Sequence, residues 1–113
     1  MKILSISLDN ELLQLRKAVL QAAGHEVVSV DSEKEARLAA QSPDPCDVAL
    51  LCHRFPAGAA RQTVRLLRQN HPATRIVYIT RVYGEWPEVE ADRYMVGADG
   101  AEALVRVLQE VHA

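Results

Sequence analysis

Short apolar runs alternate with helical patterns along the whole chain. Between the runs, apolar side chains recur every three or four residues, which predicts helices. Strands alternating with helices predict right-handed crossovers and a parallel sheet. The runs are short and rich in Val, Ile and Leu, as strands are, and they cover residues 2–8, 26–30, 47–52, 75–80 and 92–96.

The first helix is predicted over residues 11–23, and Gly24 follows it where a helix end uses left-handed geometry. A third helix is predicted over 59–70, with Val64, Leu66 and Leu67 facing inward. The apolar positions of the first helix recur at helical spacing: Leu12, Leu15, Val19 and Ala22.

Two capping-box patterns mark the starts of the other helices. Ser32 with Glu35 opens a helix that extends to about Ala40. Asp99 with Glu102 opens the last helix. The apolar positions of that helix are Leu104, Val105, Leu108 and Val111.

The connection after the fourth strand is too short for a full helix with its two joins. Only 13 residues separate Thr80 from Tyr94, and they include Gly84 and Pro87. We expect a loop with at most one helical turn around residues 86–91. The apolar side chains of this loop either fill the resulting gap or face a partner: Val82, Tyr83, Trp86 and Val89.

These elements predict one domain over residues 1–113. The fold class is α/β: a three-layer, doubly wound sandwich with a five-stranded parallel sheet in the order 2-1-3-4-5 and a shortened or missing fourth helix. A chain of this length buries a core without disulfides or metals.

Composition and charge exclude several classes of function. The net charge of -2 attracts neither nucleic acid nor an anionic membrane, and no nucleic-acid-binding motif is present. No apolar run approaches the ~20 residues of a transmembrane helix. We therefore expect a cytoplasmic protein.

Cysteines, histidines and arginines form no recognisable site. Cys46 and Cys52, if both lie on one strand, are ~20 Å apart, whereas a disulfide needs Cα atoms within ~7 Å. The histidines lack ligand spacing, so we expect neither a metal nor a cofactor. An arginine row on the third helix is more typical of a solvated face than of a nucleic-acid site: Arg61, Arg65 and Arg68.

The segment from Asp47 to Pro56 resembles the strand that carries the phosphorylated aspartate in response-regulator receiver domains. That family typically has Asp-Leu-Val-Leu-Leu-Asp, with a proline four residues after the second aspartate. Here Pro56 is in register, but Cys52 stands at the acceptor position. The resemblance extends over nearly the whole chain, through KIL at the start, the AAGHEVVSV join, Thr80 and Tyr94. It implies a CheY-like, flavodoxin-like fold.

The resemblance also shows which chemical groups this chain lacks. The acidic pair that binds magnesium in the family falls on Ser7 and Leu8, followed by Asp9. The family's lysine falls on Gly97. Because a thiol at Cys52 cannot form the acyl phosphate, the resemblance implies a degenerate receiver, or pseudo-receiver, that is not phosphorylated.

For such a domain we expect signalling by protein contact, related to two-component systems and phosphorelays, and not enzymatic activity. Thr80 and Tyr94 match the family's threonine–aromatic pair, which couples the acceptor site to the face of the fourth helix, fifth strand and fifth helix. That face is the expected surface for a protein partner or a homodimer. Its candidate anchors are Tyr83, Trp86 and Tyr94.

Three alternatives stay open at this point. One is a receiver that keeps a phosphorelay role through a divergent site, and another is an unrelated flavodoxin-like domain. The third is a Cys52-dependent enzyme or thiol redox sensor, which needs a cation near the thiol to lower its pKa. Adjacent strand residues point to opposite faces, so His53 can pair with Cys52 only if the strand has ended.

Overall fold

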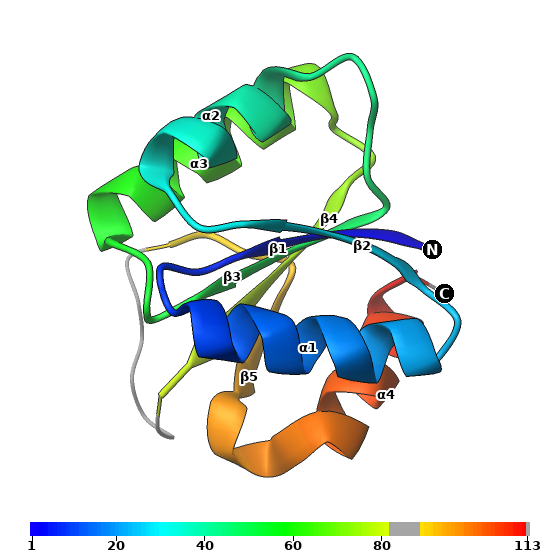
Figure 1. Cartoon of the computed structure of the whole chain (residues 1–113). Coiled ribbons are helices and arrows are strands. Elements are labelled where there is room, and N and C mark those ends of the chain that lie inside the picture. The colour runs from blue at the N-terminus through cyan, green and yellow to red at the C-terminus, as the bar shows by residue number, and fades with distance from the viewer. Residues whose placement is uncertain (82–88, 113) are drawn as a thin grey trace.

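The computed structural model describes residues 1–81 and 89–112, the last of these by its backbone only. Five strands form one sheet in the order β2-β1-β3-β4-β5, and each described pairing is parallel (Figure 1). The predicted fold class and strand order are confirmed. The strands are β1 (Lys2–Ile6), β2 (Glu26–Val30), β3 (Val48–Cys52), β4 (Arg75–Thr80) and β5 (Arg93–Val96).

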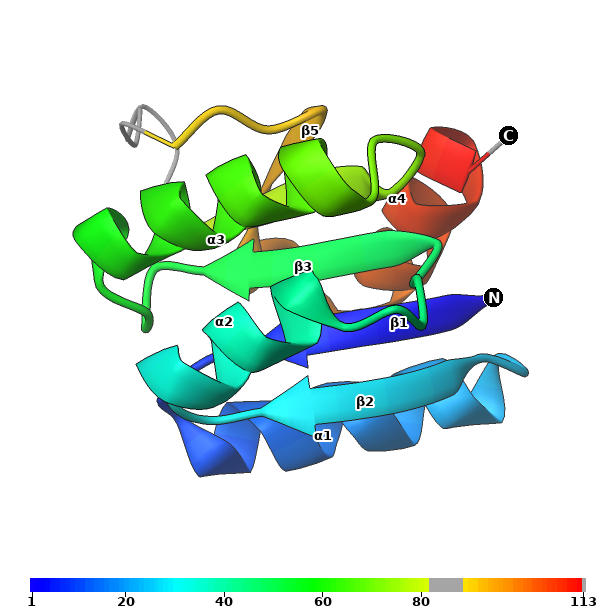
Figure 2. The ribbon, with the colours of Figure 1, turned by 90° about the horizontal axis from the view of Figure 1, so that it is seen from above.

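Helices cover both faces of this sheet. Helices α1 and α4 lie on one face, and α2 and α3 lie side by side on the other (Figures 1 and 2). A short 3-10 helix, η1 (Gly97–Asp99), leads from β5 into α4. The α-helices are α1 (Asn10–Ala22), α2 (Glu33–Gln41), α3 (Ala57–Asn70) and α4 (Gly100–His112).

The sheet divides the core into two layers. Phe55, Leu51 and Ile76 belong to the layer under α2 and α3. Leu50 and Leu108 belong to the layer under α1 and α4. Every residue of β3 is buried, as its uninterrupted apolar run predicts for a central strand covered on both faces.

Local chemistry sets the element boundaries. Strand β1 ends two residues before its predicted end, because the hydroxyl of Ser7 accepts a hydrogen bond from the backbone N–H of Asp9 and turns the chain into α1. Ser32 accepts from the N–H of Glu35 at 3.1 Å, which confirms one half of the predicted capping box. Gly24 has a φ of 92°, so the predicted left-handed position is confirmed.

The buried face of α1 differs from the predicted one. Its buried residues are Leu13, Arg16 and Leu20, whereas Leu15 is 62% exposed. The side of the helix that faces the sheet is therefore shifted by about one residue from the side that the apolar spacing predicts. An arginine thus occupies a core-facing position.

Residues 89–92 lead into β5, and the described part of the β4–β5 connection contains no helix. Val89 is 1% exposed and belongs to the core layer under α2 and α3, so it fills the gap that the short connection leaves. Val82, Tyr83 and Trp86 lie outside the described residues. Within the described part of the chain, no helix has the length and apolar character needed to cross a membrane.

Candidate functional site

A buried hydroxyl–thiol pair occupies the carboxyl-terminal edge of the central strands. Ser7 follows β1 and Cys52 ends β3, and both are fully buried. The thiol of Cys52 donates to the hydroxyl of Ser7 at 3.3 Å. Because Ser7 also accepts from the N–H of Asp9 at 3.0 Å, one serine oxygen joins the end of β3 to the start of α1. In parallel α/β sheets this edge is where ligands bind.

The donor set at this edge does not fit a magnesium ion. Magnesium prefers hard oxygen ligands, above all carboxylates, and here the pair offers a hydroxyl and a thiol. Leu8 is 47% exposed and has no donor atom in its side chain. The carboxylate of Asp9 caps α1 by accepting from the N–H of Leu12 at 3.2 Å. Nowhere in the described residues do three or more His, Cys, Asp or Glu side chains form a possible metal site.

Cys52 has no activating neighbour in its described contacts. The strand ends at this residue, and the backbone N–H of His53 donates to the carbonyl of Ile79 at 3.1 Å. The side-chain Nδ1 of His53 is buried and has no hydrogen-bond partner, so it does not pair with the thiol. Cys46 and Cys52 are both free thiols, although Cys46 lies before β3, so the condition of one shared strand is not met.

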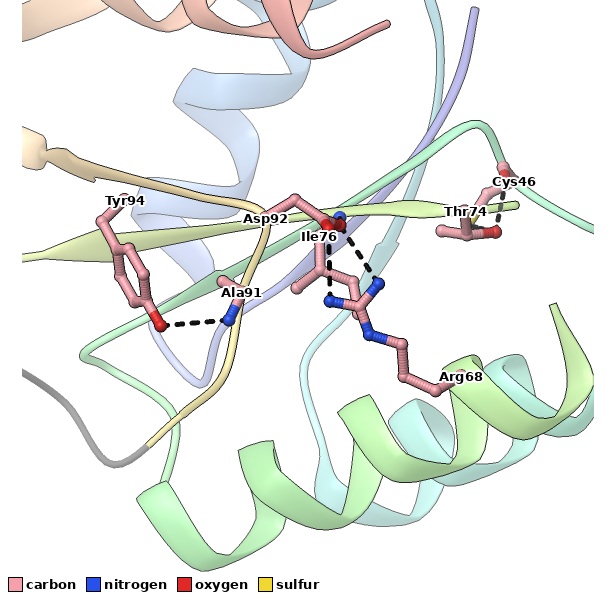
Figure 3. Close-up of polar contacts among 7 residues, drawn as sticks. All are labelled: Cys46, Arg68, Thr74, Ile76, Ala91, Asp92 and Tyr94. Carbon is pink, nitrogen blue, oxygen red and sulfur yellow. Dashed lines mark hydrogen bonds and ion pairs between the residues drawn. The ribbon is translucent and has the colours of Figure 1, made fainter. Parts of the chain in front are cut away.

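Cys46 has a different environment from Cys52. It is half-buried, and the hydroxyl of Thr74 donates to its carbonyl at 2.6 Å (Figure 3). Burial raises the pKa of the Cys46 thiol, although the side-chain hydrogen bond of the thiol with the Thr74 hydroxyl, at 4.0 Å, opposes this effect. The thiol therefore stays protonated at neutral pH.

Tyr94 of β5 forms hydrogen bonds with two of the residues that precede the strand. Its hydroxyl donates to the carbonyl of Val89 at 2.6 Å and accepts from the N–H of Ala91 at 3.0 Å (Figure 3). Its ring is 37% exposed and lies 6.4 Å from the ring of Tyr78. The second residue of the predicted pair, Thr80, is buried and donates to the carbonyl of Met95 at 3.2 Å.

Asp92 holds the same segment to its neighbours, a role that was not predicted from the sequence. Its carboxylate accepts from the N–H of Ile76 at 2.7 Å and pairs with Arg68 of α3 at 3.3 Å (Figure 3). One member of the arginine row predicted to be solvated is therefore structural. The available signal was an acidic residue directly before an edge strand.

Gly97, the residue at the family's lysine position, is the first residue of η1. A Cβ at this position would lie 3.4 Å from Cγ2 of Ile79 and 3.6 Å from the carbonyl oxygen of Thr80. Both distances are those of ordinary van der Waals contacts, so a Cβ fits at this position. Four of the residues singled out in the sequence end or follow neighbouring strands at one edge of the sheet: Ser7, Cys52, Thr80 and Gly97. Tyr94 lies instead at the start of β5.

Comparison with solved structures identifies the fold. The Vibrio cholerae chemotaxis response regulator CheY4 is 26% identical, with a TM-score of 0.83 and 97% of each chain covered. The receiver domain of the Pseudomonas aeruginosa sensor histidine kinase PA1611, with magnesium in its active-site cleft, is 20% identical, with a TM-score of 0.84 over 98% of this chain and 96% of that one. No protein-family model and no curated protein matches the sequence.

A third similar structure is the N-terminal domain of a response regulator/sensory box/GGDEF protein from Carboxydothermus hydrogenoformans. It is 16% identical, with a TM-score of 0.85 over 99% of this chain and 94% of that one. These likenesses show that the chain has the fold of response-regulator receiver domains.

Proposed function

We propose that this chain is a receiver-like signalling domain that is not phosphorylated and works by protein contact. The observation that carries the proposal is the buried pair of Ser7 and Cys52 at the edge where receivers hold their acceptor. Both side chains are inaccessible and hydrogen-bonded to each other. At this pair a phosphodonor would meet a hydroxyl and a thiol instead of a carboxylate.

The loss of chemistry involves several positions at once. Ser7 and Leu8 replace the acidic pair, Cys52 replaces the acceptor and Gly97 replaces the lysine. Asp9, the remaining carboxylate, already caps α1. A divergent phosphorelay site would have to release that cap and open a buried pair, so the geometry supports this alternative less well.

The thiol alternatives also receive little support from the geometry. A reactive cysteine needs access and a nearby cation or helix N-terminus. Cys52 is fully buried, and the hydroxyl of Ser7 is its hydrogen-bond partner. We therefore do not assign an enzymatic or redox role to it.

The contact surface that we propose is the face of β5 and α4, the last helix, which takes the place of the family's fifth. Tyr94 presents an aromatic ring that is partly exposed and held in place through its hydroxyl. Tyr94 packs toward Tyr78 on the α3 side of β5. The neighbouring Arg93, on the other side of this edge strand, forms an exposed ion pair with Glu110 of α4 at 2.8 Å. The ion pair thus adds a polar group to the α4 side of the β5 edge. Buried anchors with a polar rim are the usual anatomy of an interface. Tyr83 and Trp86 remain sequence-based candidates for the same surface.

Acetyl phosphate treatment tests the proposal. The intact chain is incubated with acetyl phosphate and magnesium, and its mass is then measured, with an aspartate-containing receiver domain as positive control. We expect no added phosphate on this chain. A stoichiometric phosphate that hydroxylamine removes would contradict the proposal, because that lability identifies an acyl phosphate.

A further inference from the structure

A cavity between α1 and α4 is lined by a buried arginine, Arg16, that has no partner among the described residues. The cavity has a volume of about 140 Å³, and its walls are mainly apolar, with Leu12 and Leu104 from the two helices and Ile79 and Met95 from the sheet. Arg16 is the one charged residue among the described residues that line it. Helices α1 and α4 lie on the same face of the sheet and contact each other (Figure 1).

Arg16 is only 9% exposed. No hydrogen-bond acceptor or carboxylate of the described chain pairs with it. A guanidinium stays charged at all ordinary pH values and has five N–H donors. Burying such a group without a partner is unfavourable, so an anion that reaches it gains a strong, charge-assisted contact.

The start of α4 lines the same cavity. Gly100 and Ala101 both contribute to the wall, and α4 is 13 residues long. The N-terminus of a helix carries a partial positive charge and favours anions. The two carboxylates nearby, Asp99 and Glu102, are exposed, and neither lines the cavity. Arg16 and the start of α4 therefore both favour a negatively charged group in this cavity.

We propose that this cavity binds a small organic carboxylate whose apolar body is about the size of a benzene ring. Apolar protein cavities of ~150 Å³ accept benzene, and this cavity has a comparable volume. The carboxylate would lie on Arg16 and the start of α4, and the ring would contact Ile79 and Met95. Inorganic phosphate lacks the apolar body that these walls require. This inference does not rest on the proposed function.

Titration of the ¹⁵N-labelled chain with benzoate tests the site. We expect saturable shifts of the Ala101 and Leu104 amides, with a dissociation constant of about 1 mM or below, as befits so small a ligand. Benzamide, which has the same shape without the charge, and inorganic phosphate should each bind at least tenfold more weakly. Benzamide or phosphate binding as tightly as benzoate, or an absence of saturation by benzoate, would overturn the proposal.

Variants of Arg16 test whether its guanidinium binds the carboxylate of benzoate. Arg16→Gln should weaken benzoate at least tenfold, whereas Lys17→Gln, which removes the neighbouring exposed charge, should leave the affinity unchanged. Arg16→Leu removes the unpaired buried charge and keeps an apolar wall, so it should melt at a higher temperature without ligand. Benzoate should raise the melting temperature of the natural chain and not that of Arg16→Leu. Equal effects on both chains would contradict the role of Arg16.

Discussion

At the scale of single residues, a neutral hydroxyl–thiol pair stands at the edge of the sheet where receiver domains have charged side chains. Ser7 and Cys52 satisfy each other in a site that excludes water. A thiol is small and weakly polar, and it tolerates such burial. A carboxylate in the same place needs a metal or a cation to offset its charge, and the described side chains around it supply neither.

Replacing Cys52 with Asp should therefore not create a phosphorylation site. We expect Cys52→Asp to lower the free energy of unfolding by about 3 kcal/mol at pH 7, the scale of an unpaired buried charge. Burial raises the pKa of the new carboxyl above its unfolded value. The folded state then holds more protons, so the loss of stability grows as pH rises and is smallest below pH 4.

Urea unfolding of Cys52→Asp between pH 3 and pH 8 measures this dependence, with Cys52→Ala as the uncharged control. The control should show no such increase with pH. Phosphorylation of Cys52→Asp at the rate of an active receiver would show that the acceptor position has been misplaced.

The two thiols should react with iodoacetamide at different rates. Cys46 is half-buried and should be alkylated in the folded chain, but more slowly than a free thiol at pH 7, because burial raises its pKa. Its rate should rise as pH approaches that raised value. Cys52 should react only after unfolding, because it is fully buried. Mass spectrometry of peptides after timed quenching resolves the two, and fast alkylation of Cys52 at pH 7 would favour the thiol-sensor alternative.

At the scale of elements, residues 89–92, which lead into β5, are held by hydrogen bonds of side chains. Tyr94 bonds to Val89 and Ala91, while Asp92 bonds to β4 and pairs with Arg68 of α3. The backbone N–H of Asp92 also donates to the carbonyl of Ile76 at 2.8 Å. These contacts continue the sheet beyond the first residue of β5.

Removing the carboxylate of Asp92 should release this segment. We expect Asp92→Ala to lower the free energy of unfolding by about 2 kcal/mol, because it leaves the N–H of Ile76 and Arg68 without their acceptor. Asp44→Ala is the matched control: it breaks the exposed ion pair with Lys2 and should change the stability much less, because solvent screens exposed ion pairs. Equal losses in chemical denaturation would show that Asp92 contributes no more than a surface charge.

Much of the architecture could be predicted from the sequence because strand length and helix spacing are local signals. The strands at 26–30 and 75–80 match their predicted bounds. The buried face of α1 could not be predicted, because Leu15 and Arg16 are neighbours and apolar spacing favours the leucine. Packing against the sheet instead buries Arg16. The roles of Ser7 and Asp92 depend on contacts with residues distant in sequence, which no local pattern reveals.

At the scale of the whole molecule, the chain has the fold of receiver domains, and we propose that it works without their phosphoryl chemistry. Two core layers pack on the two faces of the sheet, and Cys52 at the acceptor position belongs to the layer under α1 and α4. The thiol therefore contributes to the packing of the core. What remains available for signalling is the surface, and Tyr94 gives it an ordered aromatic group.

Trp86, predicted from the sequence as an interface anchor, can be tested on the intact protein. We expect Trp86→Ala to reduce the mass measured by sedimentation while the melting temperature changes little, because truncating an aromatic anchor costs ~2 kcal/mol or more of association energy. Tyr94→Phe keeps its ring and should retain association. A collapse of stability in Trp86→Ala without a change in mass would place Trp86 in the core and end the interface proposal.

The most direct test of the central claim is a titration of the ¹⁵N-labelled chain with magnesium and beryllofluoride, a mimic of the phosphoryl group. A receiver with its acceptor and acidic pair, measured in parallel, should show saturable shifts around its site. For this chain we expect no saturable shift at Ser7, Cys52, Thr80 or Gly97, because a hydroxyl, a buried thiol and a glycine replace the groups that bind the mimic and its metal. Saturable, magnesium-dependent shifts centred on these residues would contradict the account.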